Sequence, residues 1–359
     1  MGTVSDDRRL SAPGRLSNAE DLPAADGGVA TAMLPAGSLA VLADEYGLRP
    51  SAARPPVLAY LRQLWNRRSF IMAFATARNI AMYTEARLGQ LWQVLTPLLN
   101  VAVYWLIFGV ILDTSKGIPD FISFLVVGVF VFNFTQRAFI STSTVITDSL
   151  PLIRALQFPR AALPLAYVII ELQQMFLSMA VLVVIILLRH EPVTWYWLLT
   201  IPALLLQTIF NVGAGLFVAR LGSQVNDFSQ LLPFLLRTWM YLSGVLFSVL
   251  TLAESAVGKR HHELVAFLQL NPAAIYITLM RNALLLTQRL SAPGSKPANA
   301  RICRKWPGTT AHPHYYASAW CNPVINPGHL WYYAVAWAVF AMATGFYFFW
   351  RAEAKYGRG

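Results

Sequence analysis

One carboxylate stands well inside a long apolar stretch of this sequence. It is Glu171, and Gln173 and Gln174 follow it within one helical turn. A charged side chain is costly in a membrane interior, so one that stands in a membrane span is a candidate functional residue. Two interpretations are open at this point. Glu171 lines a water-filled path or holds a helix contact that serves function. Alternatively, it only lies near the cytoplasmic end of the span or forms a structural hydrogen bond to a neighbouring helix.

The motifs of nucleotide and metal chemistry are missing from the sequence. It has no Gly-x-x-x-x-Gly-Lys-Ser/Thr loop, whose backbone N–H groups would hold the phosphates of ATP. It also has no His-x-x-x-His or Cys-x-x-Cys pair at metal-ligand spacing. We therefore predict no catalytic residue, no metal site and no cofactor in this chain. Any work driven by ATP and magnesium needs a separate protein that binds them.

The two cysteines, Cys303 and Cys321, both fall in the last long polar stretch, 287–328. If this stretch is an extracytoplasmic loop, a disulfide between them is the natural interpretation. The alternative is a pair of unpaired thiols. The loop itself is either a small stapled cap or a passive spacer.

The overall composition indicates an integral membrane protein. The sequence is 56% hydrophobic and only 13% charged, whereas a typical soluble domain is about 25% charged. Its net charge of +11 comes from basic residues that flank apolar runs. Membrane topology and anionic lipid explain this placement better than nucleic acid does.

The lengths of the apolar runs predict an all-α protein with six transmembrane helices, because a helix of about 20 residues crosses the hydrocarbon core. The transmembrane domain extends over 91–359, with spans at about 91–112, 121–140, 163–188, 195–219, 228–252 and 329–350. The segment 265–286 is interrupted by Asn271-Pro272 and carries Arg281. We expect it to form two re-entrant half-helices, since irregular backbone at membrane depth must be covered by protein or water.

The N-terminal part has two regions. Residues 1–55 mix small, acidic and proline residues without apolar periodicity, which predicts a disordered cytoplasmic tail. Residues 56–90 place leucines and aromatic residues among five arginines, which predicts an amphipathic helix in the membrane interface. Arginines and lysines in the short loops place both termini on the cytoplasmic side of the plasma (inner) membrane.

Aromatic side chains are dense in three of the predicted spans. They are Tyr104, Trp105, Phe108, Phe132, Phe134, Trp239 and Tyr241. Such faces offer sugar rings a surface that makes few directional bonds, which would suit a channel. Aromatic residues also commonly face lipid or form interfacial belts.

The stretch YTEARLGQLWQVLTP at 83–97 resembles the start of the permeases of ABC-type polysaccharide exporters, the Wzm-like group. Three further stretches in the same order strengthen the resemblance. They are SLPLIRALQFPRAALPL, ARLGSQVNDFSQLLPFLLR and FLQLNPAAIYITLMRNALL. The long tail and the cysteine-containing loop depart from the common pattern, and the loop resembles that of mycobacterial galactan exporters.

The resemblance implies a homodimer of this chain bound to two copies of a Wzt-like ATPase. Its cargo would be a polysaccharide linked to a polyprenyl diphosphate. The segment that couples to the ATPase would consist of Leu152, Ile153, Arg154, Phe158, Pro159 and Arg160. The residues that attract the pyrophosphate of the lipid would be Arg78 and Arg87, since arginine matches phosphate geometry.

Two other functions stay open on the sequence. One is an ABC exporter of small lipophilic compounds, which has a similar plan of spans. The other is a membrane glycosyltransferase that uses polyprenyl-phosphate sugars and needs a catalytic carboxylate outside the membrane. Its only candidates here are Asp120, Glu254 and Glu263, none with a paired acid.

Overall fold

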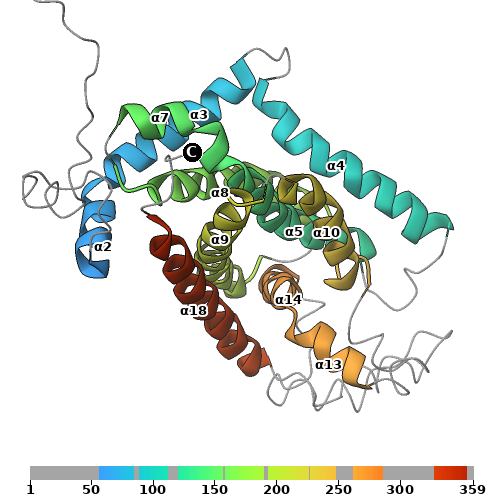
Figure 1. Cartoon of the computed structure of the whole chain (residues 1–359). Coiled ribbons are helices and arrows are strands. Elements are labelled where there is room, and N and C mark those ends of the chain that lie inside the picture. The colour runs from blue at the N-terminus through green and yellow to red at the C-terminus, as the bar shows by residue number, and fades with distance from the viewer. Residues whose placement is uncertain are drawn as a thin grey trace, which may run out of the picture. The chain divides into compact units, whose positions relative to one another are not determined.

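A computed structural model gives the fold of the chain. It describes residues 56–84, 89–111, 120–156, 158–189, 193–225, 227–247, 262–285 and 327–353. All regular elements within these ranges are helices, and no strand occurs among them (Figure 1). The helical fold class is therefore confirmed.

Five stretches of helix in the described ranges are long and apolar enough to cross a membrane. They are α4 (Trp92–Tyr104) with η2 (Trp105–Ile111), α5 (Phe121–Ser143), α8 (Ala162–Leu188), η3 (Trp195–Leu199) with α9 (Thr200–Gly222), and α18 (Pro327–Arg351). They correspond to five of the six predicted spans, so the protein is a multi-pass membrane protein. The first span is an α-helix only as far as Tyr104 and continues as a π-helix.

The span predicted at about 228–252 is not one uninterrupted helix, and its crossing of the membrane stays a prediction. Helix α10 covers Phe228–Leu242 and then ends in a turn in which Gly244 has φ 67°. Fifteen helical residues rise only about 22 Å, which is short of a hydrocarbon core of about 30 Å. The positive φ at Gly244 ends the helix although the sequence beyond it remains apolar.

The interrupted segment before the last span consists of two helices, as predicted. They are α13 (His262–Leu270) and α14 (Pro272–Leu284). Pro272 occupies the first position of α14, where its missing N–H costs no helical hydrogen bond. The re-entrant course of this pair through the membrane stays a prediction.

The amphipathic region predicted as a single helix over 56–90 is also divided. It forms α2 (Val57–Asn66) and α3 (Arg68–Thr84), which meet at Arg67. Two short helices, α6 (Val145–Asp148) and α7 (Leu150–Ala155), follow α5 and lead into α8. A single turn, η1 (Gly89–Leu91), precedes α4.

Helix α5 is the core of the bundle. It contacts α4, α8, α9, α10 and α14 (Figure 1), and 78% of its most apolar stretch is buried. In the first span, by contrast, only 17% of the most apolar stretch is buried. Most of the first span is therefore open to lipid or to another protein.

Helices α9 and α18 pack against each other at backbone distance. A Cβ atom added to Gly345 would lie 1.8 Å from the carbonyl oxygen of Gly213. A Cβ atom added to Gly213 would meet the backbone of Ala341 and Met342 at 2.3 Å. Only glycine permits so close an approach of two helices.

Candidate functional site

The predicted coupling segment lies where three distant parts of the chain meet. The Glu353 carboxylate, just after α18, accepts hydrogen bonds from the backbone N–H of Arg160 at 3.0 Å and from the hydroxyl of Tyr60 at 2.8 Å. The Tyr60 hydroxyl in turn accepts the backbone N–H of Ala161 at 3.1 Å. The Arg160 guanidinium donates to the backbone oxygen of Glu353.

Burial raises the pKa of the Glu353 carboxyl above its ordinary value. Three effects oppose this increase and favour the ionised form: the backbone N–H of Arg160, the hydroxyl of Tyr60 and the charge of Arg160. The carboxyl is therefore buried with a partner on each oxygen, as buried polar groups require.

The coupling segment has an attached side and an open side. The ring of Phe158 packs against that of Phe70 on α3, with 5.6 Å between centroids. Ile153 and Pro159 are buried, whereas Arg154 is exposed. Leu152 and Arg160 are half-buried. A movement imposed on the open side would therefore be passed to α3 through Phe158.

Glu171 faces a small pocket between α4, α5 and α8. The pocket is lined by Pro97, Phe130, Asn133, Phe134, Arg137, Glu171, Met175 and Ser178. Its free volume is about 10 Å³, close to the room that one water needs. The Oε2 atom of Glu171 is buried without a protein partner in the described part of the chain.

A seam of amide and hydroxyl groups joins α3 to α8 beside this pocket. Asn79 donates to the Oε1 atom of Gln173 at 3.0 Å, and Gln173 donates to the hydroxyl of Thr76 at 3.0 Å. Arg137 on α5 donates to the Oε1 atom of Gln174 at 3.0 Å. Sequence reasoning missed Thr76, Asn79 and Arg137. The three-residue spacing of Thr76 and Asn79, which places them on one face of α3, was the available signal.

The broken end of α10 is held by a buried arginine. Arg281 on α14 donates to the carbonyl oxygens of Gly244 and Val245, each at 2.9 Å, and to that of Phe124 at 3.0 and 3.1 Å. Gly128 leaves room for the guanidinium, since a Cβ atom there would lie 2.4 Å from Nη2. Arg281 thus satisfies two carbonyl groups in the turn that follows α10 and one at the start of α5.

Asn271 completes the closure of this break. Its Oδ1 atom accepts the indole N–H of Trp239 at 2.9 Å and the backbone N–H of Ala273 at 3.1 Å. Its Nδ2 atom donates to the carbonyl oxygen of Leu242 and to the hydroxyl of Ser243, both at 3.2 Å. One side chain therefore caps the start of α14 and ties it to the end of α10.

The family profile described as ABC-2 type transporter matches residues 70–285. The chain belongs to the ABC-2 type transporter family. The matched range contains the predicted coupling segment, the pocket at Glu171 and the closure of α10. The family resemblance that the sequence predicts is therefore confirmed.

The named relatives of this ABC-2 transporter include permease proteins. The chain is 25% identical over 244 residues to the O-antigen export system permease protein RfbA of Myxococcus xanthus, which covers 68% of this chain and 90% of that protein. It is 26% identical over 168 residues to a protein of the same name from Klebsiella pneumoniae, covering 46% of this chain and 64% of the relative.

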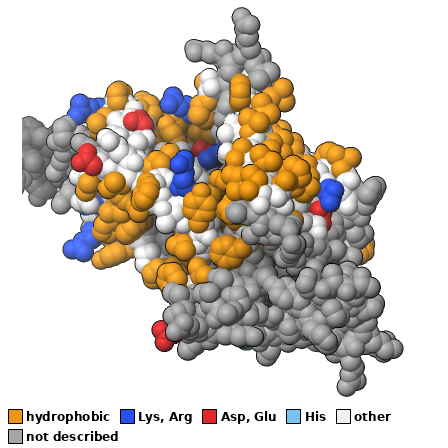
Figure 2. All heavy atoms as spheres, turned by 90° about the vertical axis from the view of Figure 1, so that its right-hand side faces the viewer, with side chains coloured by type: hydrophobic (Ala, Val, Ile, Leu, Met, Phe, Trp, Pro, Cys, Tyr) orange, Lys and Arg blue, Asp and Glu red, His pale blue; other side chains and the backbone are white. Residues whose placement is uncertain are grey.

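The aromatic residues predicted to line a channel in this ABC-2 transporter differ in exposure. Trp105 and Tyr241 are exposed, and Tyr104, Phe108 and Trp239 are half-buried. Figure 2 shows a broad spread of hydrophobic side chains on one face of the molecule. Phe132 and Phe134 are instead buried in the core, and Phe132 packs edge-on against Trp239 at 5.7 Å between centroids.

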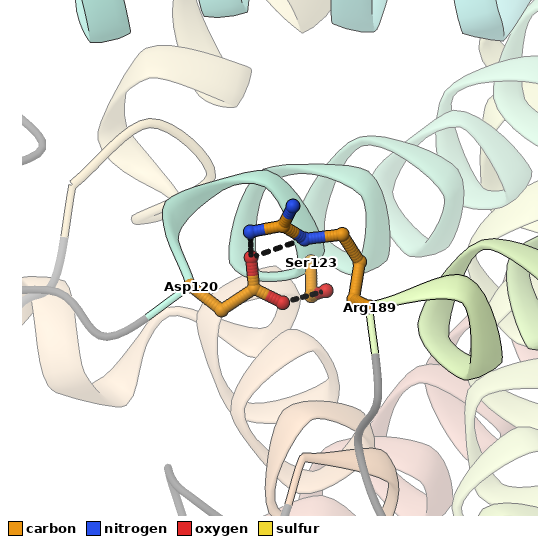
Figure 3. Close-up of polar contacts among 3 residues, drawn as sticks. All are labelled: Asp120, Ser123 and Arg189. Atoms are coloured by element: carbon orange, nitrogen blue, oxygen red, sulfur yellow. Dashed lines mark hydrogen bonds and ion pairs between the residues drawn. The ribbon is translucent and has the colours of Figure 1, made fainter.

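Asp120, the candidate acid of a glycosyltransferase, is held in an ion pair. Its Oδ1 atom lies 2.9 Å from Nη2 and 3.0 Å from Nε of Arg189, and its Oδ2 atom accepts the hydroxyl of Ser123 (Figure 3). These contacts join the start of α5 to the end of α8, which indicates a structural role.

The remaining predicted residues are exposed or lie outside the described ranges. Arg78 is exposed on α3. Arg87, Cys303 and Cys321 lie outside the residues that the structure describes. Their roles as lipid-binding residue and disulfide stay predictions.

Proposed function

We propose that this chain is the transmembrane permease subunit of an ATP-driven exporter that moves a lipid-linked polysaccharide outward across the plasma (inner) membrane. The observation that carries this proposal is the similarity to an O-antigen export permease over 90% of that protein's length. Galactan on a polyprenyl diphosphate is the cargo that the sequence resemblance predicts.

In this proposal, two Wzt-like ATPase chains bind the segment from Leu152 to Arg160. The segment suits a lever because its inner side is packed on α3 while Arg154 and Leu156 are exposed. Closure of the ATPases on ATP would push the segment. The attached helices α3 and α8 would then move with it and open a route for the cargo.

A homodimer accounts for the uncovered first span. Only 17% of that span is buried within one chain, and its large exposed side chains include Leu99, Val103 and Trp105. A second copy placed against α4 and α10 would cover these side chains and form a channel between the two protomers. Trp105 and Tyr241 would line it first, and Phe132 and Phe134 only after the helices separate. Both termini would be cytoplasmic.

The head group of the lipid carrier is proposed to bind near α3. Arg78 is exposed there, and a guanidinium pairs well with the oxygens of a diphosphate. Arg87 would be a second contact. Export that continues at the wild-type rate after both arginines are changed to glutamine would contradict this assignment.

The first experiment is affinity purification of the chain from its native membrane in mild detergent, followed by mass spectrometry of the proteins and lipids that accompany it. We expect a P-loop ATPase in equal amount, together with lipid-linked glycan. If no ATPase accompanies the chain in several detergents, the proposed exporter lacks its source of energy and the proposal fails.

A further inference from the structure

Helix α8 begins without a capping side chain of its own. Its N-cap residue is Ala161, and no side-chain cap hydrogen bond is present there. The N–H groups of Ala162 and Leu163 are bonded to the carbonyl oxygens of Pro159 and Arg160, at 2.9 and 3.2 Å. Pro164 has no N–H group. The N–H groups of Arg160 and Ala161 are left for partners from elsewhere in the chain.

The partners come from two regions far away in the sequence. Glu353 takes the N–H group of Arg160, which is 193 residues distant, and Tyr60 takes that of Ala161, which is 101 residues distant. Tyr60 is 1% exposed, and its ring lies 6.0 Å from that of Phe346 on α18. We call these hydrogen bonds from Tyr60 and Glu353 the cap of α8. The cap therefore joins α2, α8 and the end of α18 to one another.

We infer that Tyr60 and Glu353 are positioning residues for coupling, which rests on the proposed function. The residues from Phe158 to Ala161 lead directly into α8, so a push on α7 reaches α8 along the backbone through them. With the cap in place, this turn is rigid and α2, α8 and α18 move as one body. Without the cap, the turn bends and absorbs the push, and ATP is hydrolysed without export.

The two side chains allow a graded test of this role. Tyr60→Phe removes the hydroxyl, and with it two hydrogen bonds, while the ring that packs on Phe346 remains. Glu353→Gln leaves one accepting oxygen where two are used, because an amide nitrogen donates only. It also removes a negative charge from the positive end of α8. Glu353→Gln keeps the volume of the side chain, and Tyr60→Phe removes a single oxygen atom.

The test uses the full complex of this chain with its ATPase in native membranes. We expect Tyr60→Phe and Glu353→Gln to assemble with the ATPase in normal amount and to hydrolyse ATP within about twofold of wild type. We expect the polymer exported per ATP to fall about tenfold, which corresponds to a loss of about 1.4 kcal/mol. The double variant should be no worse than the stronger single variant, because both act on one cap. Tyr332→Phe and Glu263→Gln, at exposed positions, are matched controls and should export normally.

Hydrogen exchange supplies a readout that does not depend on transport. In purified protein, the amide of Ala161 should exchange at least about tenfold faster in Tyr60→Phe than in wild type, since exchange of a protected amide follows local opening. Unchanged exchange would overturn the proposed cap. Unchanged export per ATP, or losses of export that only match losses of assembled complex, would overturn the positioning role. If the wild-type complex moves no polymer, the proposed function fails instead, and the exchange result still decides the cap.

Discussion

The guanidinium carbon of Arg281 lies 3.3 Å from the centre of the Phe124 ring, and the same side chain donates two hydrogen bonds to the backbone oxygen of Phe124. Arg281 of α14 thus contacts both the ring and the backbone oxygen of Phe124, in the first turn of α5. The remaining donors of Arg281 hold the end of α10. The closure of the α10 break therefore depends on this cation.

We expect Arg281→Met to destabilise the folded protein by about 3 kcal/mol or more, because each carbonyl left buried without a donor costs about 1–3 kcal/mol. Arg281→Lys should be intermediate, since one ammonium cannot span the fork of a guanidinium. Thermal unfolding in detergent measures the change. Arg189→Met is the control, because a surface ion pair contributes about 1 kcal/mol or less. Equal losses in Arg281→Met and Arg189→Met would contradict the assigned role.

Gly345→Ala should force α9 and α18 apart, because its new methyl group meets backbone, which cannot turn aside as a side chain can. Overpacking of this kind typically costs about 1–3 kcal/mol, and we expect the upper end of that range. Gly215→Ala is the matched control on α9, since its new methyl group would meet the side chain of Thr142 at 3.2 Å. Thermal unfolding of the two variants should differ clearly. Identical melting temperatures would show that the helices are not in backbone contact.

Arg137 and Glu171 line the same pocket, so their substitutions should not be additive. Arg137→Met removes the cation that lines the pocket beside Glu171, together with its hydrogen bond to Gln174. It should cost about 1.5–3 kcal/mol, as loss of a hydrogen bond to a charged group does. Glu171→Gln alone should cost less. In the double variant, Glu171→Gln should restore part of the loss, and thermal unfolding of the four proteins gives the interaction energy. Strict additivity would mean that the two side chains act independently.

Phe158→Ala should weaken transmission from the coupling segment to α3. An aromatic pair contributes about 1 kcal/mol beyond its buried area, which corresponds to roughly a fivefold loss of export per ATP. Phe217→Ala, which breaks the pair with Phe348 at 5.1 Å, disrupts a similar contact away from the segment. It should affect stability but leave export per ATP unchanged. Normal export in Phe158→Ala with the ATPase bound would remove Phe158 from the coupling path.

The raised pKa of Glu353 predicts a dependence of stability on pH. The folded protein binds this proton more tightly than the unfolded chain does, so the stabilising contribution is complete below the ordinary pKa of 4.5. It is lost as the pH rises through the raised value of the folded protein. Arg160 and Tyr60, which face the carboxyl, limit the loss because they favour the charged form. The difference in melting temperature between wild type and Glu353→Gln should therefore change with pH across this window. A constant difference would contradict the raised pKa.

The apolar runs predicted most of the helices because burial in lipid and helix length are both local properties of the sequence. The end of α10 was missed for a physical reason. The sequence from Val245 to Leu252 stays mainly apolar, whereas the helix stops because Gly244 takes a positive φ. That conformation is stabilised by Arg281, which is 37 residues further along the chain. A prediction made from the residues of α10 and its neighbours in sequence therefore cannot include Arg281.

The candidate sites show the same limit. The position of Glu171 in an apolar run was sufficient to select it, and the break at Asn271-Pro272 was visible as a proline within a helical pattern. Glu353 follows the last span as an ordinary charged residue. Its role arises only from the fold, which brings it to the start of a helix that the chain forms much earlier.

The distance in sequence between Arg160 and Glu353 sets an order of events during synthesis. A ribosome that adds about 5–20 residues per second needs roughly 10–40 s to make the 193 residues that separate them. For most of that interval α8 is already made, but the turn before it has no carboxylate to bind. In a nascent chain, the turn before α8 therefore stays without this hydrogen bond until the last helix has been made and packed. A chain cut short before Glu353 would never form it.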